Sequence, residues 1–372
     1  MRIIFSGGGT GGHIYPILAL IERLKERKLT TDDEILFIGT NKGLESKIVP
    51  AAKIPFKTLA VQGFNRKHLL RNFKTIKLFL NATKDARKIL EEFKPDVVVG
   101  TGGYVCGAIV YTAAKMKIPT LIHESNSVVG LANKFLAHYV DKVCYTFDDV
   151  VRQFPEKKKL VKTGNPRSQQ VLSLNETKID LKKKWNLNPD VFTVLIFGGS
   201  RGALAINNIM ERSIDELGDK PYQIIWATGQ VYYGQIKERL AKHKIAKNIV
   251  IVPYIDNMPG LLPQMTCVVS RSGATSLAEF TALGVPAVLI PSPNVTHNHQ
   301  EKNAMDLEKA GAALVINEND LNPNNFVSSI DHILLDPNCA QKMSAESKKL
   351  CCCDASDKLI YEMQNLINKN NF

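Results

Sequence analysis

The chain has 372 residues, of which 44% are hydrophobic and 23% are charged, a composition typical of a folded soluble protein with two domains of ordinary size. Its formal net charge of +12 indicates an anionic partner, which could be a phosphorylated substrate, an anionic lipid or nucleic acid. The seven cysteines lack the spacing of a metal site or a disulfide framework, which favours reduced thiols in a cytosolic protein without a signal peptide.

In chain order, short apolar runs alternate with helical patterns, which predicts parallel sheets with crossover helices. The first strand covers residues 3–5, a glycine-rich stretch follows, and a helix is predicted over 14–28. The other strands predicted in the first half cover 35–38, 97–99 and 120–123. Residues 97–114 carry no charge over 18 positions, and we interpret them as a buried strand, a glycine turn and a helix, not a membrane span.

The same pattern starts again in the second half. An apolar strand is predicted over 193–197, the stretch VLIFGGSRGA from Val194 leads from it into a glycine turn, and a helix is predicted over 204–217. The remaining predicted strands cover 223–226, 249–252, 267–269 and 287–290. The sequence therefore predicts an α/β protein with two Rossmann-like, doubly wound parallel-sheet domains that face a ligand-binding cleft and meet near residues 164–166.

Five of the six residues from Gly7 to Gly12 are glycine, which suits close contact between the backbone and a phosphorylated ligand at a helix start. The spacing also matches a dinucleotide fingerprint, but residues 39–42 at the end of the second strand lack the acid that NAD binding requires. His13 follows in the first helical turn. The helix dipole there favours a neutral imidazole that can accept a proton, although a purely structural histidine is an alternative.

A third helix start of this kind reads SRSGATSLAEFTALGVP from Ser270. Small residues around Gly273 can bring backbone donors to a diphosphate, and Glu279 can accept hydrogen bonds from ribose hydroxyls or be an ordinary solvated helix residue. His297 and His299 could suggest a metal site. No HExxH, added Cys/His cluster or Asp-x-Asp accompanies them, so we predict no metal.

Eight motifs in order carry a resemblance: GGGTGGHIYP, GTGGYVCG, HESNSVVGLANK, GNPR, FGGSRGA, YIDNM, SRSGATSLAEFTALGVPAVLIP and NHQEKNA. Together they resemble the bacterial glycosyltransferases of the GT-B fold that add N-acetylglucosamine (GlcNAc) to lipid I in peptidoglycan synthesis. The resemblance implies an N-terminal acceptor and membrane domain over 1–164 and a C-terminal UDP-GlcNAc domain over 165–350. It also implies that the final helix, about 355–372, packs back on the first domain.

The resemblance further implies an inverting transfer of GlcNAc from UDP-GlcNAc to the muramoyl 4-hydroxyl of undecaprenyl-diphospho-muramoylpentapeptide, which gives lipid II and UDP. His13 would be the catalytic base, because inversion needs a base on the acceptor side. Helix N-termini and backbone donors would stabilise the leaving UDP without a metal or cofactor. The other substrate-binding residues that the resemblance implies are Thr10, Gly11, Gly12, Asn126, Ser200, Ile255, Ala274, Thr275, Ser276, Glu279 and Gln300.

The stretch RKHLLRNFKTIKLFL, from Arg66 to Leu80, predicts a membrane contact. Leu69, Phe73, Ile76 and Leu80 form an apolar helical stripe among basic residues that include Lys74 and Lys77. Such a helix can lie on an anionic bilayer surface, and the polyprenyl acceptor favours a peripheral location on the cytoplasmic face of the cell membrane. The alternative is a helix that packs its stripe into the first domain.

Three other functions remain open at this level. One is a GT-B transferase with another lipid acceptor, such as diacylglycerol, which transfer from UDP-GlcNAc to a lipid I analogue would distinguish. A UDP-GlcNAc epimerase of similar fold would act without an acceptor. A basic nucleic-acid-binding protein would need interleaved aromatic and basic residues or a known motif, and the sequence has neither, so we expect no nucleic-acid partner.

Overall fold

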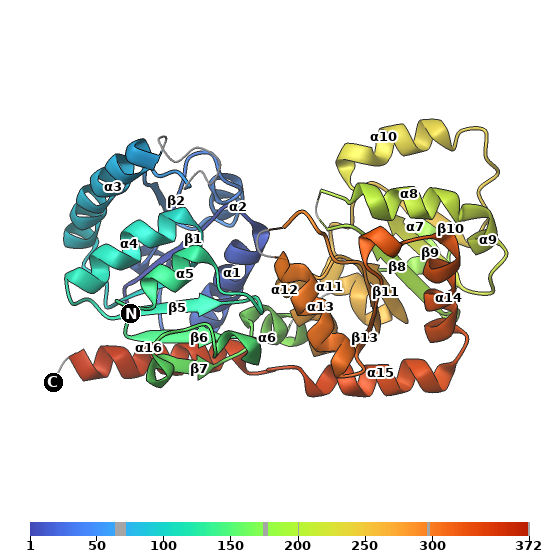
Figure 1. Ribbon diagram of the computed structural model, residues 1–372. Helices are drawn as coiled ribbons and strands as arrows, with labels where there is room; N and C mark the ends of the chain where they lie inside the picture. Colours follow the sequence, from blue (N-terminus) through green and yellow to red (C-terminus); the bar gives the residue numbers. More distant parts are fainter. Residues whose placement is uncertain (64–71, 174–177, 200, 296–297, 371–372) are drawn as a thin grey trace. The chain divides into compact units, whose positions relative to one another are not determined.

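The computed structural model describes residues 1–63, 72–173, 178–199, 201–295 and 298–370 (Figure 1). The chain forms two compact units: unit 1 comprises Met1–Gln170 and Cys352–Phe372, and unit 2 comprises Val171–Cys351. Each unit is built on one parallel sheet, which confirms the predicted α/β class with two doubly wound domains. The sequence had placed the division between residues 164 and 165.

The sheet of unit 1 has seven strands in the order β3-β2-β1-β4-β5-β6-β7, and all its pairings are parallel. The strand order reverses between β1 and β4. The interpretation of residues 97–114 is confirmed, because a buried strand there is followed by helix α4 (Tyr104–Lys115). The strands are β1 (Ile3–Gly7), β2 (Ile35–Gly39), β3 (Phe56–Thr58), β4 (Val97–Gly102), β5 (Thr120–Glu124), β6 (Lys142–Tyr145) and β7 (Leu160–Lys162).

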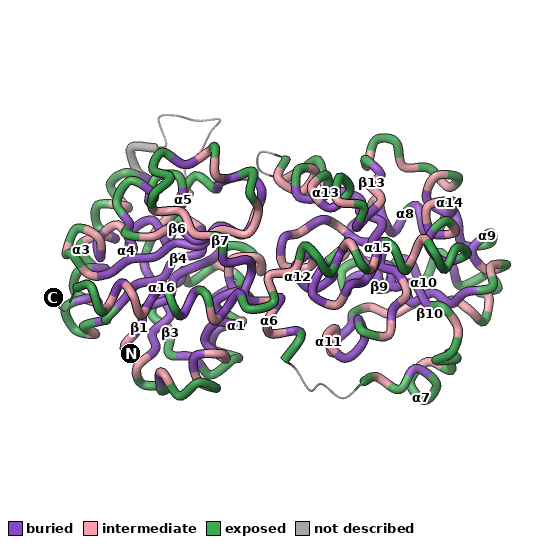
Figure 2. Tube along the Cα trace, turned by 90° about the horizontal axis from the view of Figure 1, so that it is seen from below, coloured by how far each residue is buried: buried purple, intermediate pink, exposed green. Residues whose placement is uncertain are grey.

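Helices cover both faces of this sheet because alternate strand residues point to opposite sides. Ile3 and Phe5 pack with α1 and the last helix, α16, whereas Ile4 packs with α3, α4 and α5. Figure 2 shows the buried strands between helices with exposed outer surfaces. The helices besides α4 are α1 (Gly11–Glu26), α2 (Glu45–Ala51), α3 (Asn72–Phe93), α5 (Leu131–Leu136), α6 (Pro166–Ser173), which runs into unit 2, and α16 (Ala355–Asn370).

The sheet of unit 2 has six parallel strands in the order β10-β9-β8-β11-β12-β13, with the reversal between β8 and β11. Its strands are β8 (Thr193–Phe197), β9 (Gln223–Ala227), β10 (Ile249–Val252), β11 (Cys267–Ser270), β12 (Ala287–Leu289) and β13 (Ala313–Val315). Its helices are α7 (Leu181–Trp185), α8 (Leu204–Arg212), α9 (Ile214–Gly218), α10 (Gln230–Arg239), α11 (Met258–Leu261), α12 (Ala274–Leu283), α13 (His299–Lys309), α14 (Pro323–Leu334) and α15 (Pro337–Lys349).

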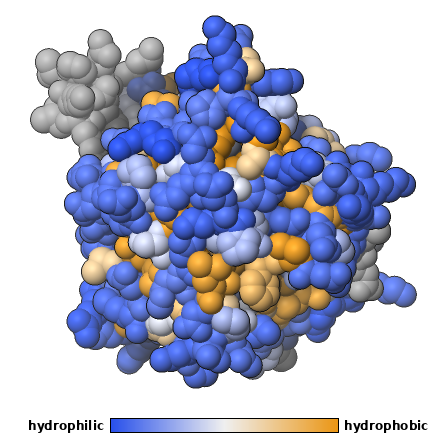
Figure 3. Space-filling view, turned by 90° about the vertical axis from the view of Figure 1, so that its right-hand side faces the viewer, coloured by the Kyte–Doolittle hydropathy of each residue, from blue (hydrophilic) through white to orange (hydrophobic). Residues whose placement is uncertain are grey.

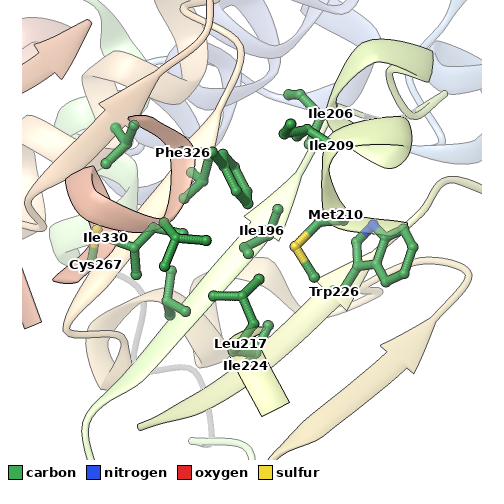
Figure 4. Close-up of a cluster of buried hydrophobic side chains, with 14 of the residues drawn as sticks. Ile196, Ile206, Ile209, Met210, Leu217, Ile224, Trp226, Cys267, Phe326 and Ile330 are labelled. Atoms are coloured by element: carbon green, nitrogen blue, oxygen red, sulfur yellow. The ribbon is translucent and has the colours of Figure 1, made fainter. Parts of the chain in front are cut away.

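The core of unit 2 brings strand and helix side chains together. In Figure 4, Ile196 of β8 lies between Phe326 of α14 and Met210 of α8, and Trp226 of β9 lies beside Met210. These residues are completely or almost completely buried. The indole N–H of Trp226 donates to Asn207 Oδ1 at 3.0 Å, so the largest core side chain also has its polar atom paired.

The single helix predicted over 204–217 is wrong, because it is two helices. Ser213 ends α8 with φ −106° and ψ 5°, outside the helical range, and α9 begins at the next residue. Its N–H is shared between the carbonyl oxygens of Ile209 and Met210, at 3.0 and 3.2 Å. The apolar periodicity continues through this break, which is why the pattern gave no sign of it.

The expectation of reduced thiols throughout is wrong at two positions. Cys351 and Cys353 are disulfide-bonded, whereas the other five cysteines are free. Since the chain has seven cysteines, the bond joins Cys351 to Cys353. Burial raises the pKa of the free thiols of Cys106, Cys144 and Cys267 well above their ordinary value.

Figure 3 shows a face on which hydrophilic side chains predominate and hydrophobic ones form small separate groups. Within the described ranges, no helix combines the length and the hydropathy needed to cross a bilayer.

Candidate functional site

In each unit, the glycine loops lie where the strand order reverses. In unit 1, residues 8–10 follow β1 and residue 103 follows β4, and these two strands flank the reversal. In unit 2, residues 198–199 and 201–203 follow β8 and residues 271–273 follow β11, again on either side of the reversal. Ligands of doubly wound sheets bind outside the carboxyl ends of the strands at such points. The two units therefore offer one candidate site each.

The glycines of the first loop serve two different purposes. A Cβ on Gly7 would lie 2.2 Å from Thr101 Oγ1, and one on Gly8 would lie 2.6 Å from Glu45 Oε1, so these two are required by internal packing. Gly9 has φ +84°, and the space beside it is open. The prediction that the whole cluster serves ligand contact is therefore too broad, because only the exposed part of the loop has room for a ligand.

The imidazole of His13 is held in one tautomer. Its Nδ1 lies 2.8 Å from the carbonyl oxygen of Gly8, which can only accept, so Nδ1 carries the proton in the neutral ring. Nε2 then has the free lone pair, and it faces Gly102, where a Cβ would lie 2.9 Å away. The half-buried ring therefore has the tautomer that a proton acceptor at Nε2 needs.

The residues expected around His13 gather at the same helix start. Thr10 is the N-cap of α1, but its side chain does not cap the helix. Its hydroxyl lies 3.4 Å from His13 Nδ1 instead. Gly11 and Gly12 form the first turn of α1, whose leading N–H groups have no partner within the helix. This end of α1 can therefore receive anionic or hydroxyl oxygens.

Glu45, the first residue of α2, is the main residue of this region that sequence reasoning missed. Its side chain is 0% exposed, and its carboxylate accepts from Gly9 N at 2.9 Å and from Thr40 N and Oγ1 at 3.1 and 2.7 Å. Burial by itself raises the pKa of Glu45, but these hydrogen bonds outweigh burial and lower it below the ordinary value. The only sequence signal was an acid between glycine-rich segments just beyond the second strand.

Asn126 is oriented by a second buried acid, Glu124, at the end of β5. The N–H and side-chain amide of Asn126 donate to Glu124 Oε1 at 3.1 and 3.3 Å. The other carboxylate oxygen accepts from Gly130 N at 3.0 Å and from Asn133 Nδ2 at 2.9 Å. Glu124 thus fixes the loop that carries Asn126, a role the sequence analysis did not assign.

In unit 2, Ala274, Thr275 and Ser276 form the first turn of α12, as the sequence indicated. Gly273 is the N-cap residue of this helix, and no side chain caps the helix there. The space where a Cβ of residue 273 would lie is open. Glu279 follows on the same helix and is 8% exposed, so a solvated surface role is wrong. The hydroxyl of Thr275 is buried and has no hydrogen-bond partner in the described part of the chain.

Gln300 connects two of the unit 2 loops. Its Oε1 accepts from Ser292 N at 2.9 Å, and its backbone oxygen accepts from Ser272 Oγ at 2.6 Å, in the loop before α12. Ile255 follows β10, and its side chain is 2% exposed, which anchors the backbone of this loop. Ser200 and His297 lie outside the described residues. No group of three or more potential metal ligands occurs among the residues that the structure describes.

Two family models match the chain. The glycosyltransferase family 28 N-terminal domain matches residues 3–145, and the glycosyltransferase family 28 C-terminal domain matches residues 193–359. A relative from Lactobacillus johnsonii is 77% identical over 99% of both chains. Its name is UDP-N-acetylglucosamine–N-acetylmuramyl-(pentapeptide) pyrophosphoryl-undecaprenol N-acetylglucosamine transferase.

Solved structures agree with this match. The crystal structure of Acinetobacter baumannii MurG is 26% identical, with a TM-score of 0.77 over 98% of this chain and 99% of that one. A UDP-GlcNAc 2-epimerase from Neisseria meningitidis, bound to UDP-GlcNAc, has a TM-score of 0.69 at 16% identity over 98% of this chain and 99% of that one. At 16% identity, the similarity to the epimerase shows a shared fold and nothing about activity.

Proposed function

We propose a function from the premise that this chain belongs to glycosyltransferase family 28: it transfers GlcNAc from UDP-GlcNAc to undecaprenyl-diphospho-N-acetylmuramoylpentapeptide, lipid I. The observation that carries this function is the 77% identity, over 99% of both chains, with a relative named for that transfer. The products are lipid II and UDP, so the enzyme is a glycosyltransferase of peptidoglycan synthesis.

The two sites divide the substrates between the units. We assign UDP to unit 2, where the first turn of α12 offers backbone donors to the diphosphate and Glu279 accepts from the ribose. The same assignment gives the uracil edge to the backbone of Ile255, the diphosphate side to Ser200 and the sugar hydroxyls to Gln300. In unit 1, Thr10, Gly11, Gly12 and Asn126 border the transferred sugar.

The proposed reaction uses His13 as the general base. Nε2 takes the proton of the muramoyl 4-hydroxyl as that oxygen forms a bond to the anomeric carbon of GlcNAc. The bond from that carbon to the diphosphate breaks, and its electron pair leaves on UDP. Attack opposite the leaving group turns the α-linked donor into a β(1→4) product. The tautomer of His13 supports this role because it leaves Nε2 able to accept.

We place the enzyme at the cytoplasmic membrane surface because unit 1 carries an exposed aromatic surface. Ile76 and Leu80 of α3 are 47% and 56% exposed, so the alternative that the whole predicted stripe packs into unit 1 is wrong for these two. Arg66, Leu69 and Arg71 lie outside the described residues, as do the side chains of Phe73 and Lys74. The surface comprises the exposed Ile76, Leu80, Leu131, Phe135 and Tyr139 and the half-buried Phe79 and Tyr111.

The aromatic surface is continuous and has cations at its edge. The rings of Phe79 and Phe135 are 6.2 Å apart, and those of Tyr111 and Tyr139 are 4.9 Å apart. Lys115 Nζ lies 5.0 Å from the centroid of the Tyr139 ring, and Lys77 and Lys134 are exposed nearby. Aromatic rings with basic neighbours suit the headgroup region of an anionic bilayer. This composition supports peripheral attachment where the polyprenyl acceptor resides.

A transfer assay with UDP-GlcNAc and a short-chain lipid I analogue tests the function. Formation of a lipid II analogue and UDP in equal amounts is the expected result. Transfer to diacylglycerol in place of lipid I would point to a different lipid acceptor. Loss of UDP-GlcNAc with no acceptor present, and with its sugar epimerised, would contradict the proposed transfer.

A further inference from the structure

One peptide group separates the buried carboxylate of Glu45 from the imidazole of His13. The N–H of Gly9 donates to Glu45 Oε2 at 2.9 Å, and the carbonyl oxygen of Gly8 accepts from His13 Nδ1 at 2.8 Å. That carbonyl and that N–H belong to the same peptide bond, and they point in opposite directions because the peptide bond is trans. Glu45 and His13 therefore hold the two sides of a single rigid group.

Glu45 is built into this position. A Cβ on Gly8, Gly39 or Gly43 would lie 2.6 Å or less from an atom of the Glu45 side chain, so three glycines make room for it. Its other oxygen accepts both the N–H and the hydroxyl of Thr40. A carboxylate with three donors and no exposed surface stays ionised, and each of these hydrogen bonds is charge-assisted.

We propose that Glu45 is a positioning residue for His13: its carboxylate holds the Gly8–Gly9 peptide so that Gly8 O keeps the Nδ1 proton and Nε2 stays the proton acceptor. The inference rests on the proposed role of His13 as the base. Hydrogen bonds in a chain polarise one another, so the charge on Glu45 strengthens Gly8 O as an acceptor. Carboxylates often fix a histidine tautomer by direct contact, and here the peptide group transmits the effect.

The test compares Glu45→Gln with wild type by nitrogen-15 NMR of the histidine rings, at one pH and without substrates. Wild type should show His13 with the proton on Nδ1, and His13→Ala identifies its signals. The N–H of Gly9 and the N–H and hydroxyl of Thr40 all donate to the Glu45 carboxylate. A glutamine amide can accept through one atom only, and its NH₂ group would face donors. The Gly8–Gly9 peptide therefore loses its fixed orientation. A second His13 tautomer, protonated at Nε2, should then appear.

The matched kinetic measurement separates positioning from binding. Glu45→Gln should lower kcat about 10- to 100-fold, as is typical when a partner behind a functional group is lost, with an unchanged KM for UDP-GlcNAc. The control is Asp141→Asn. Asp141 also accepts the N–H and hydroxyl of one threonine, Thr120, at 2.8 and 2.9 Å, but at the amino end of β5. This control should keep the wild-type His13 spectrum and kcat.

Three outcomes decide the proposal. A wild-type His13 spectrum or a wild-type kcat in folded Glu45→Gln overturns it. If Glu45→Gln does not fold, Thr40→Val removes one hydrogen bond to the carboxylate, and it should shift the His13 tautomer in the same direction by less; an unchanged spectrum there also overturns the proposal. If His13→Ala keeps its kcat, the base role fails, while the NMR comparison still shows whether Glu45 sets the tautomer.

Discussion

Arg23 and Asp357 lie 334 positions apart in the chain and form a two-point ion pair within unit 1. Arg23 Nε donates to Asp357 Oδ1 at 3.0 Å, and Nη2 donates to Oδ2 at 2.8 Å. Arg27 Nη1 and Gln169 Nε2 reach the same carboxylate at 3.1 and 2.6 Å. Asp357 therefore joins the last helix, α16, to both α1 and α6.

Asp357→Asn should lower the free energy of unfolding by about 1–2 kcal/mol at pH 7, because a partly exposed charged hydrogen bond is lost. Hydrogen bonding from Arg23 lowers the pKa of Asp357 below its ordinary value. Its contribution is therefore complete above the unfolded pKa of about 4 and is lost as pH falls through the folded value.

Urea unfolding of wild type and variant from pH 7 to pH 3 measures this difference, which should shrink on the acid side. The control is Asp354→Asn, since Asp354 forms an ion pair with the exposed Lys358, four positions along the chain, at 2.9 Å. That change should cost less than about 0.5 kcal/mol. A difference between Asp357→Asn and wild type that grows as pH falls would contradict the assignment.

His13→Ala should lower kcat about 10²- to 10⁴-fold, the usual effect of removing a general base, while UDP binding stays intact. The reason is the free lone pair on Nε2 that the Gly8 contact leaves. Steady-state kinetics with a lipid I analogue gives kcat, and calorimetry gives the UDP affinity. His332→Ala, an exposed histidine of unit 2, is the control. Near-normal turnover by His13→Ala would show that another group takes the proton.

Glu279→Ala should weaken UDP binding about ten- to hundredfold, because a charged hydrogen bond to the ribose is worth about 1.5–3 kcal/mol. Calorimetric titration with UDP measures the change. Glu238→Ala removes an exposed glutamate of α10 in the same unit and should leave the affinity unchanged. Thermal unfolding of both variants checks that the nearly buried Glu279 is not needed for folding alone. An unaltered UDP affinity would remove Glu279 from the ribose site.

Ile76→Ser with Leu80→Ser should reduce binding to anionic vesicles, since both side chains belong to the aromatic surface and are exposed. Each basic residue near an anionic surface adds about 1 kcal/mol, so wild-type binding should also weaken as salt rises. Sedimentation with vesicles of anionic and of neutral lipid measures both effects.

The control for the membrane surface is Val231→Ser with Leu335→Ser, which removes two exposed apolar side chains of unit 2. This pair should bind vesicles like wild type, and both double variants should keep their affinity for soluble UDP. Equal vesicle binding by wild type and the Ile76/Leu80 variant at low salt would place the membrane contact on another part of the chain.

Of the thirteen strands in the described part of the chain, the sequence predicted nine and missed β3, β6, β7 and β13. Three of the missed strands, Phe56–Thr58, Leu160–Lys162 and Ala313–Val315, have three residues each, and all three lie at sheet edges, where burial is weaker. Three residues are too few to establish an alternating or continuous apolar pattern. These segments form strands because each pairs with a longer or more buried neighbouring strand of the sheet.

The site was predictable where the signal is local and unpredictable where it is not. A glycine turn before His13, or before Ala274, is visible in a few consecutive letters. The contact of Glu45 with Gly9 joins residues 36 positions apart, and neither segment contains a sequence motif that predicts it. A dinucleotide site would need an acid at the end of the second strand, within residues 39–42, and none is present there. The acid lies at the start of the next helix and binds the loop itself.

The place of α16 in unit 1 also gives this protein an order of assembly on the ribosome. Unit 2 is one continuous segment, whereas unit 1 is completed only by the residues from Cys352 onward. Leu359, Ile360 and Met363 fill the same core as Ile3 and Phe5, so that core stays open while the whole of unit 2 is translated. During translation, unit 2 is therefore complete before unit 1, although most of unit 1 precedes unit 2 in the sequence. The strands of unit 1 that precede unit 2 in the chain are therefore among the last to be sealed from water, and α16 closes their core.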